Sequence, residues 1–280
     1  MFLQNVNLMF LNYILGNYLN LSRIEKLAKP QYAYDWDNCG LLAGNRKSQV
    51  DKILITLDIT KEVALEAKEK NCQMIISHHP LIFKAVKNLS TDTYEGEVLS
   101  ILYKNNIALY CAHTSLDIAS GGVNDVLCEK LMLNNISLVS EMNVLGETVA
   151  CARKGDLPHD FSKGELIEYI KNITGAKKLD YYLLDKTYKT IALCTGAGEE
   201  FAFDSDADVF LTGEIKYHTA LEMKRQNISF IAAGHYFTEV HIAEGLSRYL
   251  QKQFNMLQYS VEVIKSETNT NPFENQEDIL

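Results

Sequence analysis

The chain has 280 residues, of which 47% are hydrophobic and 22% charged. These values exclude an intrinsically disordered chain and a disulfide-built miniprotein, and the length allows one large domain or about two of ordinary size. The 27 Lys and Arg against 36 Asp and Glu give a formal net charge of −9. Because a negatively charged protein repels phosphate backbones, we do not expect nucleic acid as a partner.

The six cysteines are spread along the chain and form no Cys-x-x-Cys pair. This spacing argues against a structural zinc knuckle. Most of them lie inside apolar runs, so we expect small buried hydrophobes in a protein of a reducing compartment, the cytoplasm.

Residues 1–21 form an apolar-rich N-terminal extension. They contain no Lys or Arg, and asparagines interrupt the apolar run, so the segment is neither a secretory signal nor a membrane span. Its apolar side chains recur at helical spacing, which predicts an amphipathic helix. The residues concerned are Val6, Met9, Phe10, Tyr13 and Ile14.

Beyond the extension, short β-rich runs alternate with helical stretches. Strands are predicted at 53–57, 74–77, 107–112, 191–195, 209–212 and 228–232, and helices at 61–70, 123–131, 215–225 and 237–250. The alternation predicts two α/β domains with mixed, largely parallel sheets. The first domain would comprise residues 22–130 and 232–280, and the second 131–231.

Side chains suited to metal binding follow several of these strands, at the positions where ligands collect in open α/β sheets. They are His78, His79, His113, Asp117, Glu214, His235 and Glu239. Adjacent histidine side chains diverge, so His78 and His79 suit a site in which each ring addresses a different ion. His235 and Glu239 stand four residues apart, so one helical turn brings them to the same side.

These patterns predict a dinuclear centre, with Glu239 placed where it can bridge two cations. The ligands would be His78, His79, Asp117, His235 and Glu239. A mixed set of imidazoles and carboxylates favours Zn²⁺, Fe²⁺ or Mn²⁺ over Ca²⁺. Taken alone, Asp117 could cap a helix and Glu239 could be a first-turn glutamate; the grouping at strand exits favours metal.

The turn Thr195-Gly-Ala-Gly198 resembles a phosphate-binding turn. It lacks the third glycine of a dinucleotide loop and the Gly-Lys-Ser/Thr of a P-loop. A plain tight turn is therefore the favoured interpretation.

Five segments between about Ser22 and Lys265 together resemble the GTP cyclohydrolase I type 2 family, also called NIF-three-like. They are Asp35-Trp-Asp-Asn-Cys-Gly-Leu-Leu42, Ser77-His-His-Pro-Leu-Ile82, Ala112-His-Thr-Ser-Leu-Asp117, Leu211-Thr-Gly-Glu214 and Ala233-Gly-His-Tyr-Phe-Thr-Glu239. The resemblance implies a NIF-three-like fold, a toroidal homohexamer and a dinuclear site facing an internal cavity, with Glu239 shared by both ions. The chain departs from the usual pattern at Cys39, where members carry Ser or Val.

The first functional hypothesis is a metal-dependent hydrolase acting on a nucleotide or another phosphorylated small molecule. The family name suggests GTP, although nothing in the residues specifies guanine. His113 and Glu214 would be catalytic residues that shuttle protons. The alternative is a non-catalytic, hexameric metal-binding scaffold or adaptor protein.

Overall fold

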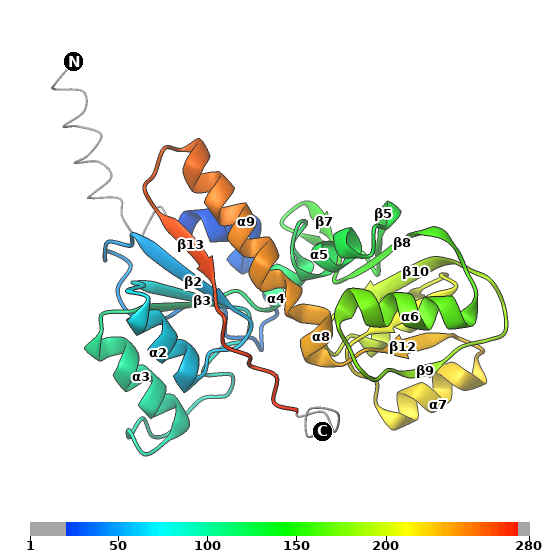
Figure 1. Ribbon diagram of the computed structural model, residues 1–280, viewed down its shortest axis with the longest axis horizontal. Helices are drawn as coiled ribbons and strands as arrows, with labels where there is room; N and C mark the ends of the chain where they lie inside the picture. The colour runs from blue at the N-terminus through cyan, green and yellow to red at the C-terminus, as the bar shows by residue number, and fades with distance from the viewer. Residues whose placement is uncertain (1–20, 274–280) are drawn as a thin grey trace. The chain divides into compact units, whose positions relative to one another are not determined.

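The computed structural model describes residues 21–273 (Figure 1), and the predicted N-terminal helix lies outside these residues. The described chain forms two compact units. Unit 1 comprises residues 21–116 and 243–270, and unit 2 comprises 117–242 and 271–273. Among the described residues, no helix is long and apolar enough to cross a membrane.

Unit 1 is built on a sheet whose described strands run in the order β1-β4-β3-β2-β13. The strands are β1 (Gly40–Ala43), β2 (Lys52–Thr56), β3 (Met74–Ser77), β4 (Ala108–Cys111) and β13 (Glu262–Lys265). The pairings β13-β2, β2-β3 and β3-β4 are parallel, and β1 joins β4 antiparallel. Helices α2 (Lys61–Glu69) and α3 (Tyr94–Lys104) lie on one side of the sheet and α9 (His241–Met256) on the other (Figure 1).

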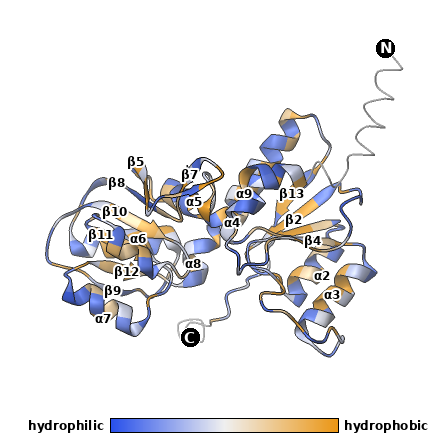
Figure 2. Ribbon diagram, turned by 180° about the vertical axis from the view of Figure 1, so that it is seen from behind, coloured by the Kyte–Doolittle hydropathy of each residue, from blue (hydrophilic) through white to orange (hydrophobic). Residues whose placement is uncertain are grey.

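The core of unit 1 forms where the central strands meet α2 and α3. Leu54, Ile75 and Leu109 occupy matching positions on β2, β3 and β4, and each is fully buried. They belong to one hydrophobic cluster with Val63 of α2 and Val98 of α3. Because both faces of these strands are covered, their sequences read as continuous apolar runs, which Figure 2 shows as orange strands.

Unit 2 contains a larger mixed sheet, with the described strands in the order β5-β8-β10-β11-β12-β9. They are β5 (Asn134–Val139), β8 (Ala152–Phe161), β9 (Asp180–Tyr182), β10 (Tyr188–Cys194), β11 (Val209–Thr212) and β12 (Phe230–Ala232), beside a hairpin of β6 (Met142–Val144) and β7 (Glu147–Val149). The β10-β11 and β11-β12 pairings are parallel, and the other three are antiparallel.

Several further helices have bounds within the described residues. They are η1 (Pro30–Tyr32), α4 (Thr114–Ile118), α5 (Val123–Lys130), α6 (Lys163–Thr174), η2 (Glu199–Asp204), α7 (Tyr217–Arg225) and α8 (His235–Glu239). Helix α6 has a complete capping box, in which the Ser162 side chain accepts from the Glu165 backbone and the Glu165 side chain accepts from Ser162. Such reciprocal bonds satisfy donors that the helix start would otherwise leave open.

The structure confirms an α/β protein with mixed sheets, and it changes details of the predicted elements. The helix expected at 237–250 is two helices, α8 and α9, and the first begins at His235 rather than Phe237. Gly234, with a φ of 93°, makes the abrupt turn that allows this early start. Helix α5 belongs to unit 2, because Leu127 and Cys128 share a core with Leu211.

Glu66 of α2 anchors the segment that follows β13. Its carboxylate accepts from Lys70 Nζ (2.8 Å), from the Glu267 backbone N–H (2.9 Å) and from the Thr268 hydroxyl (2.7 Å), and the Ser266 hydroxyl also donates to it. Burial alone would raise the pKa of Glu66, but these hydrogen bonds outweigh it and lower the pKa from 4.5 to about 2. The ionised carboxylate is therefore the form that holds the segment.

A core deletion in unit 1 should be far more costly than the same change at its surface. Leu109→Ala should lower the free energy of unfolding by about 2–5 kcal/mol, because it leaves a cavity beside Ile75. The matched control is Leu89→Ala, at a leucine that is 54% exposed. This change should alter the free energy of unfolding by less than about 0.5 kcal/mol. Urea denaturation followed by Trp36 fluorescence measures both, and equal losses would contradict the packing described.

The Glu66 contacts should make the stability of unit 1 depend on pH. The pKa of Glu66 is lower in the folded state, so its stabilisation is complete above about pH 4.5 and disappears as the pH falls towards about 2. Glu66→Gln should therefore lower the free energy of unfolding by about 1 kcal/mol at neutral pH, since solvent screens part of the interaction. The difference from the wild type should shrink in acid, as measured by urea unfolding at several pH values. Glu69→Gln, on the exposed side of α2, is the control; a loss for Glu66→Gln that is constant with pH would disprove the assignment.

Candidate metal centre

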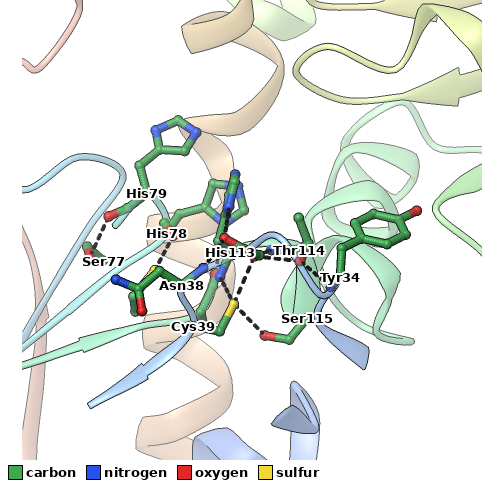
Figure 3. Close-up of polar contacts among 12 residues, drawn as sticks. Tyr34, Asn38, Cys39, Ser77, His78, His79, His113, Thr114 and Ser115 are labelled. Carbon is green, nitrogen blue, oxygen red and sulfur yellow. Dashed lines mark hydrogen bonds and ion pairs between the residues drawn. The ribbon is translucent and has the colours of Figure 1, made fainter. Parts of the chain in front are cut away.

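Three histidine rings gather at the carboxyl end of the unit 1 sheet (Figure 3). Strand register brings them together, because Thr56 of β2 is opposite Ser77 of β3, and Ser77 is opposite Cys111 of β4. Two residues beyond these positions, the chain carries Asp58, His79 and His113. His78 directly precedes His79.

The three rings are close enough to share an ion. One ligand nitrogen of each of His78, His79 and His113 lies within 4.8 Å of the others. The His78 ring centroid is 4.8 Å from that of His79 and 5.2 Å from that of His113. This group belongs entirely to unit 1, so it is part of one compact body.

Each of these rings has its Nδ1 atom against an oxygen acceptor. The pairs are His78 Nδ1 with Ala112 O (2.9 Å), His79 Nδ1 with Asp58 Oδ1 (2.7 Å) and His113 Nδ1 with Asp37 Oδ1 (2.9 Å). A neutral ring that donates from Nδ1 carries its lone pair on Nε2. Metal-ligating histidines ordinarily donate their other N–H to a carboxylate or carbonyl in this way. The donor set therefore fits a divalent transition metal.

Asp37 fixes the orientation of His113. Its side chain is fully buried and also accepts from the Thr114 backbone N–H (3.0 Å) and the Thr114 hydroxyl (2.5 Å). Burial alone would raise the pKa of Asp37, but hydrogen bonds from His113, Thr114 and Cys39 outweigh it and hold the pKa well below its usual value. Asp37 is thus an ionised acceptor at neutral pH.

Asp58 does the same for His79. Its second oxygen accepts from the Thr270 hydroxyl (2.6 Å), which lies beyond β13. Burial opposes ionisation, but the hydrogen bond and charge of His79 prevail, so the pKa of Asp58 is lowered. Two ionised carboxylates thus lie immediately behind the histidine group, where they increase the basicity of the rings.

Cys39 is the exception to the expectation that the cysteines are small buried hydrophobes. The other five are buried, whereas Cys39 is half-buried beside the histidine group. Its Sγ lies 3.1 Å from Asp37 Oδ2 and 3.4 Å from the His113 backbone nitrogen. Hydrogen bonding from Cys111, supported by Ser115, lowers the pKa of the Cys39 thiol to about 7. An ionisable thiol thus lies next to His113.

Unit 2 contains a second group of metal-ligand residues. On α8, His235 Nε2 lies 3.0 Å from Glu239 Oε2, as the four-residue spacing predicts. The Glu239 carboxylate is buried, and one of its oxygens lies within 4.8 Å of a carboxylate oxygen of Asp117. Glu214 Oε1 lies 3.2 Å from His235 Nδ1, so Glu214 can orient the ring of His235.

The turn after β10 makes room for the Glu239 carboxylate. Gly196 has a φ of +64°, and a side chain there would overlap Glu239 Oε1 and would lie 3.2 Å from His235 Nε2. Its backbone N–H donates to Thr238 Oγ1 (3.1 Å). The turn at residues 195–198, interpreted from the sequence as a plain tight turn, therefore helps to position the candidate ligand Glu239.

The predicted site residues fall into these two groups. His113, predicted as a catalytic residue, belongs to the same group as His78 and His79, and Glu214, also predicted as catalytic, contacts His235. Sequence reasoning missed Asp37 and Asp58 as acceptors behind the rings. Asp58 directly follows the predicted strand 53–57, and Asp37 belongs to the segment 35–42 that carried the resemblance, so both could have been found.

The fold and these groups define a two-unit α/β protein whose histidine and carboxylate side chains can hold a metal ion. The family model described as Duf34/NIF3 (NGG1p interacting factor 3) matches residues 20–272. The chain belongs to this family.

Curated relatives and solved structures agree with this assignment. The chain is 34% identical over 255 residues to a "GTP cyclohydrolase 1 type 2 homolog" from Clostridium perfringens, which covers 90% of this chain and 96% of the relative. It is 30% identical to "Protein NIF3 homolog" from Schizosaccharomyces pombe, with 89% and 94% covered. A crystal structure of a Staphylococcus aureus hypothetical protein matches with a TM-score of 0.87 and 28% identity, covering 93% of this chain and 99% of that chain.

Filling the space at Gly196 should weaken metal binding without disrupting the fold. Gly196→Ala should displace the flexible Glu239 carboxylate and lower the affinity for Mn²⁺ or Zn²⁺ by about tenfold or more. Gly146→Ala is the matched control, because Gly146 also has a positive φ (+83°) but has open space around it. Both variants should lose about 1 kcal/mol of stability from backbone strain. Equilibrium dialysis with elemental analysis measures the metal; equal affinities in the two variants would rule out the positioning role of Gly196.

Proposed function

We propose that this protein is a metal-dependent hydrolase with a dinuclear centre of two divalent ions per subunit. The ions would be zinc, iron or manganese, and the substrate a nucleotide or another phosphorylated small molecule. The proposed ligands are His78, His79, Asp117, His235 and Glu239, with Glu239 shared by both ions.

One observation carries the proposal. All three rings of the unit 1 group pair Nδ1 with an oxygen acceptor and bring a ligand nitrogen within 4.8 Å of the others. Imidazoles placed together repel one another once protonated, and this cost favours a metal-binding role for the group over a purely structural one. A metal ion that receives the lone pairs of His78 and His79 would remove this conflict and leave His113 Nε2 to exchange a proton.

Divalent ions in such a centre supply Lewis acidity, which lowers the pKa of water and polarises the bond under attack. The residues of this chain supply position and proton transfer. Asp37 holds a proton on His113 Nδ1, which leaves His113 Nε2 as the atom that accepts and returns a proton. Glu214 orients His235 through Nδ1, and a catalytic role for it remains our prediction.

The names of several relatives support GTP as the first substrate to test. The Clostridium perfringens relative and one from Clostridium acetobutylicum, 32% identical, are both called "GTP cyclohydrolase 1 type 2 homolog". A reaction of that kind hydrolyses a C–N bond of the guanine ring, which is consistent with a hydrolytic centre. The contacts among the histidines and carboxylates do not select guanine over another base, so other nucleotides should be tested in the same assay.

A protein-binding scaffold is the second candidate function. The family description, NGG1p interacting factor 3, names a protein interaction rather than a reaction. In that case the metal would stabilise the subunit without turnover. The toroidal homohexamer and the cytoplasmic location expected from the sequence remain proposals, and sedimentation tests the first.

The decisive experiment combines metal content with turnover. The metal-loaded protein should contain about two ions per chain and should hydrolyse GTP or another member of a nucleotide and phosphoester panel. His78→Ala and Glu239→Gln should lose metal and activity together. His159→Ala, at an exposed histidine of unit 2, is the control and should retain both.

His113→Ala separates two roles of that residue. Activity lost with full metal content assigns His113 to proton transfer, whereas a drop in metal content makes it a ligand. A metal content of about one ion per chain or less after reconstitution would disprove the dinuclear centre. Full metal content with no turnover across the panel would disprove the enzyme and leave the scaffold.

A further inference from the structure

We propose that Trp36 and Phe83, backed by Tyr34, form an aromatic shelf that stacks a flat heteroaromatic ring of the ligand beside His113. This inference rests on the proposed function, because it describes how the ligand of the same centre is held. The metal-binding side chains do not determine which chemical group of the bound molecule lies beside them, and the shelf would select a flat ring.

The shelf is a continuous set of ring contacts. The rings of Tyr34 and Trp36 are stacked, with centroids 5.5 Å apart and planes at 19°. Phe83 meets Trp36 edge-on at 5.8 Å. The centroid of His113 lies 6.3 Å from that of Trp36 and 6.1 Å from that of Phe83, so the shelf adjoins the histidine group.

The rings of Trp36 and Phe83 are exposed, and leaving apolar surface of this size in water is unfavourable in free energy. Trp36 is 60% exposed and Phe83 48%. Large apolar side chains that stay in water beside convergent polar groups are typical of ligand sites. Covering these faces would recover apolar area that the fold leaves in water.

The backbone beneath the shelf is fixed on both sides. The Tyr34 N–H donates to Thr114 Oγ1 (3.2 Å), and the Asp37 carboxylate accepts from the Thr114 N–H (3.0 Å). The Asn38 side chain donates to Ile82 O (2.6 Å), next to Phe83. Figure 3 shows Tyr34, Thr114 and Asn38 in this network. The shelf is therefore organised before a ligand arrives, which reduces the entropy lost on binding.

The size of the shelf favours a small ligand over a protein partner. One Trp and one Phe bury on the order of 150–250 Å² each, whereas stable protein interfaces bury about 1,200–2,000 Å² in total. A purine or another fused ring matches one indole face, and aromatic stacking accepts any such ring. Its remaining groups would then lie beside the histidines.

Trp36 is the only tryptophan of the chain, so its fluorescence reports on the shelf directly. The metal-loaded protein is titrated with GTP, guanosine, inorganic tripolyphosphate and ribose 5-phosphate. GTP and guanosine should quench the emission in a saturable way, and the two ligands without a ring should not. Quenching by tripolyphosphate equal to that by GTP would overturn the proposal.

Variants test whether the ring contact supplies affinity. Trp36→Ala should weaken guanosine and GTP binding by about tenfold to a hundredfold in equilibrium dialysis, and Phe83→Ala should weaken it less. Trp36→Phe should restore most of the affinity. Tyr103→Ala removes an equally exposed ring (60%) on α3 of the same unit and should change nothing. Unchanged guanosine binding in Trp36→Ala would overturn the shelf.

The outcomes separate this inference from the proposed function. Ring binding that depends on Trp36 without turnover would support the shelf and disprove the hydrolase. Metal-dependent turnover of GTP with the same KM in Trp36→Ala would support the hydrolase and disprove the shelf. A change in sedimentation of Trp36→Ala without a change in ligand binding would assign the patch to contacts between copies of this chain and overturn the proposal.

Discussion

The arrangement of unit 1 depends on the register of three parallel strands. Thr56, Ser77 and Cys111 lie opposite one another, so the positions two residues further on also converge. Those positions hold Asp58, His79 and His113, and the Asp58–His79 contact follows directly from the register. Because the side chains of a strand alternate between faces, a slip of one residue would direct all three to the opposite side. The apolar core behind them prevents such a slip.

Much of the fold follows from the alternation of strands and helices, and the exceptions have physical reasons. Strands 74–77 and 209–212 are found at the predicted bounds, because fully buried strands are short apolar runs between polar ends. The short edge strands β5, β9 and β13 are partly exposed, so they lack that pattern. Their pairings depend on distant parts of the chain, which a local pattern does not contain. The break between α8 and α9 at Val240 has no Pro or Gly to mark it.

The candidate ligands were easier to predict than the residues that support them. Histidines directly after strands are rare enough to stand out, whereas Asp37 lies in a loop before β1 and reaches His113 across 76 positions of sequence. The role of Gly196 could not be predicted either, because it depends on how closely the Glu239 carboxylate approaches the Gly196 backbone. Residue type suggests a ligand, and the sequence offers Asp37 and Asp58 as polar candidates, but their pairing with particular rings comes from tertiary structure. The pKa of Cys39 likewise depends on neighbours that strand pairing supplies.

Asp37 links the two halves of the proposed ligand site. It follows Trp36 directly in the sequence, and its carboxylate holds the ring of His113 and the start of α4. A ligand that stacks on Trp36 and an ion that binds the histidines would therefore both depend on one buried carboxylate. If each stabilises the same position of this loop, each increases the affinity for the other by the same factor, because such coupling is reciprocal. A substitution at Asp37 would then weaken ring binding, although its side chain touches no ring of the ligand. An exposed aromatic patch that merely adjoins the histidines would not show this coupling.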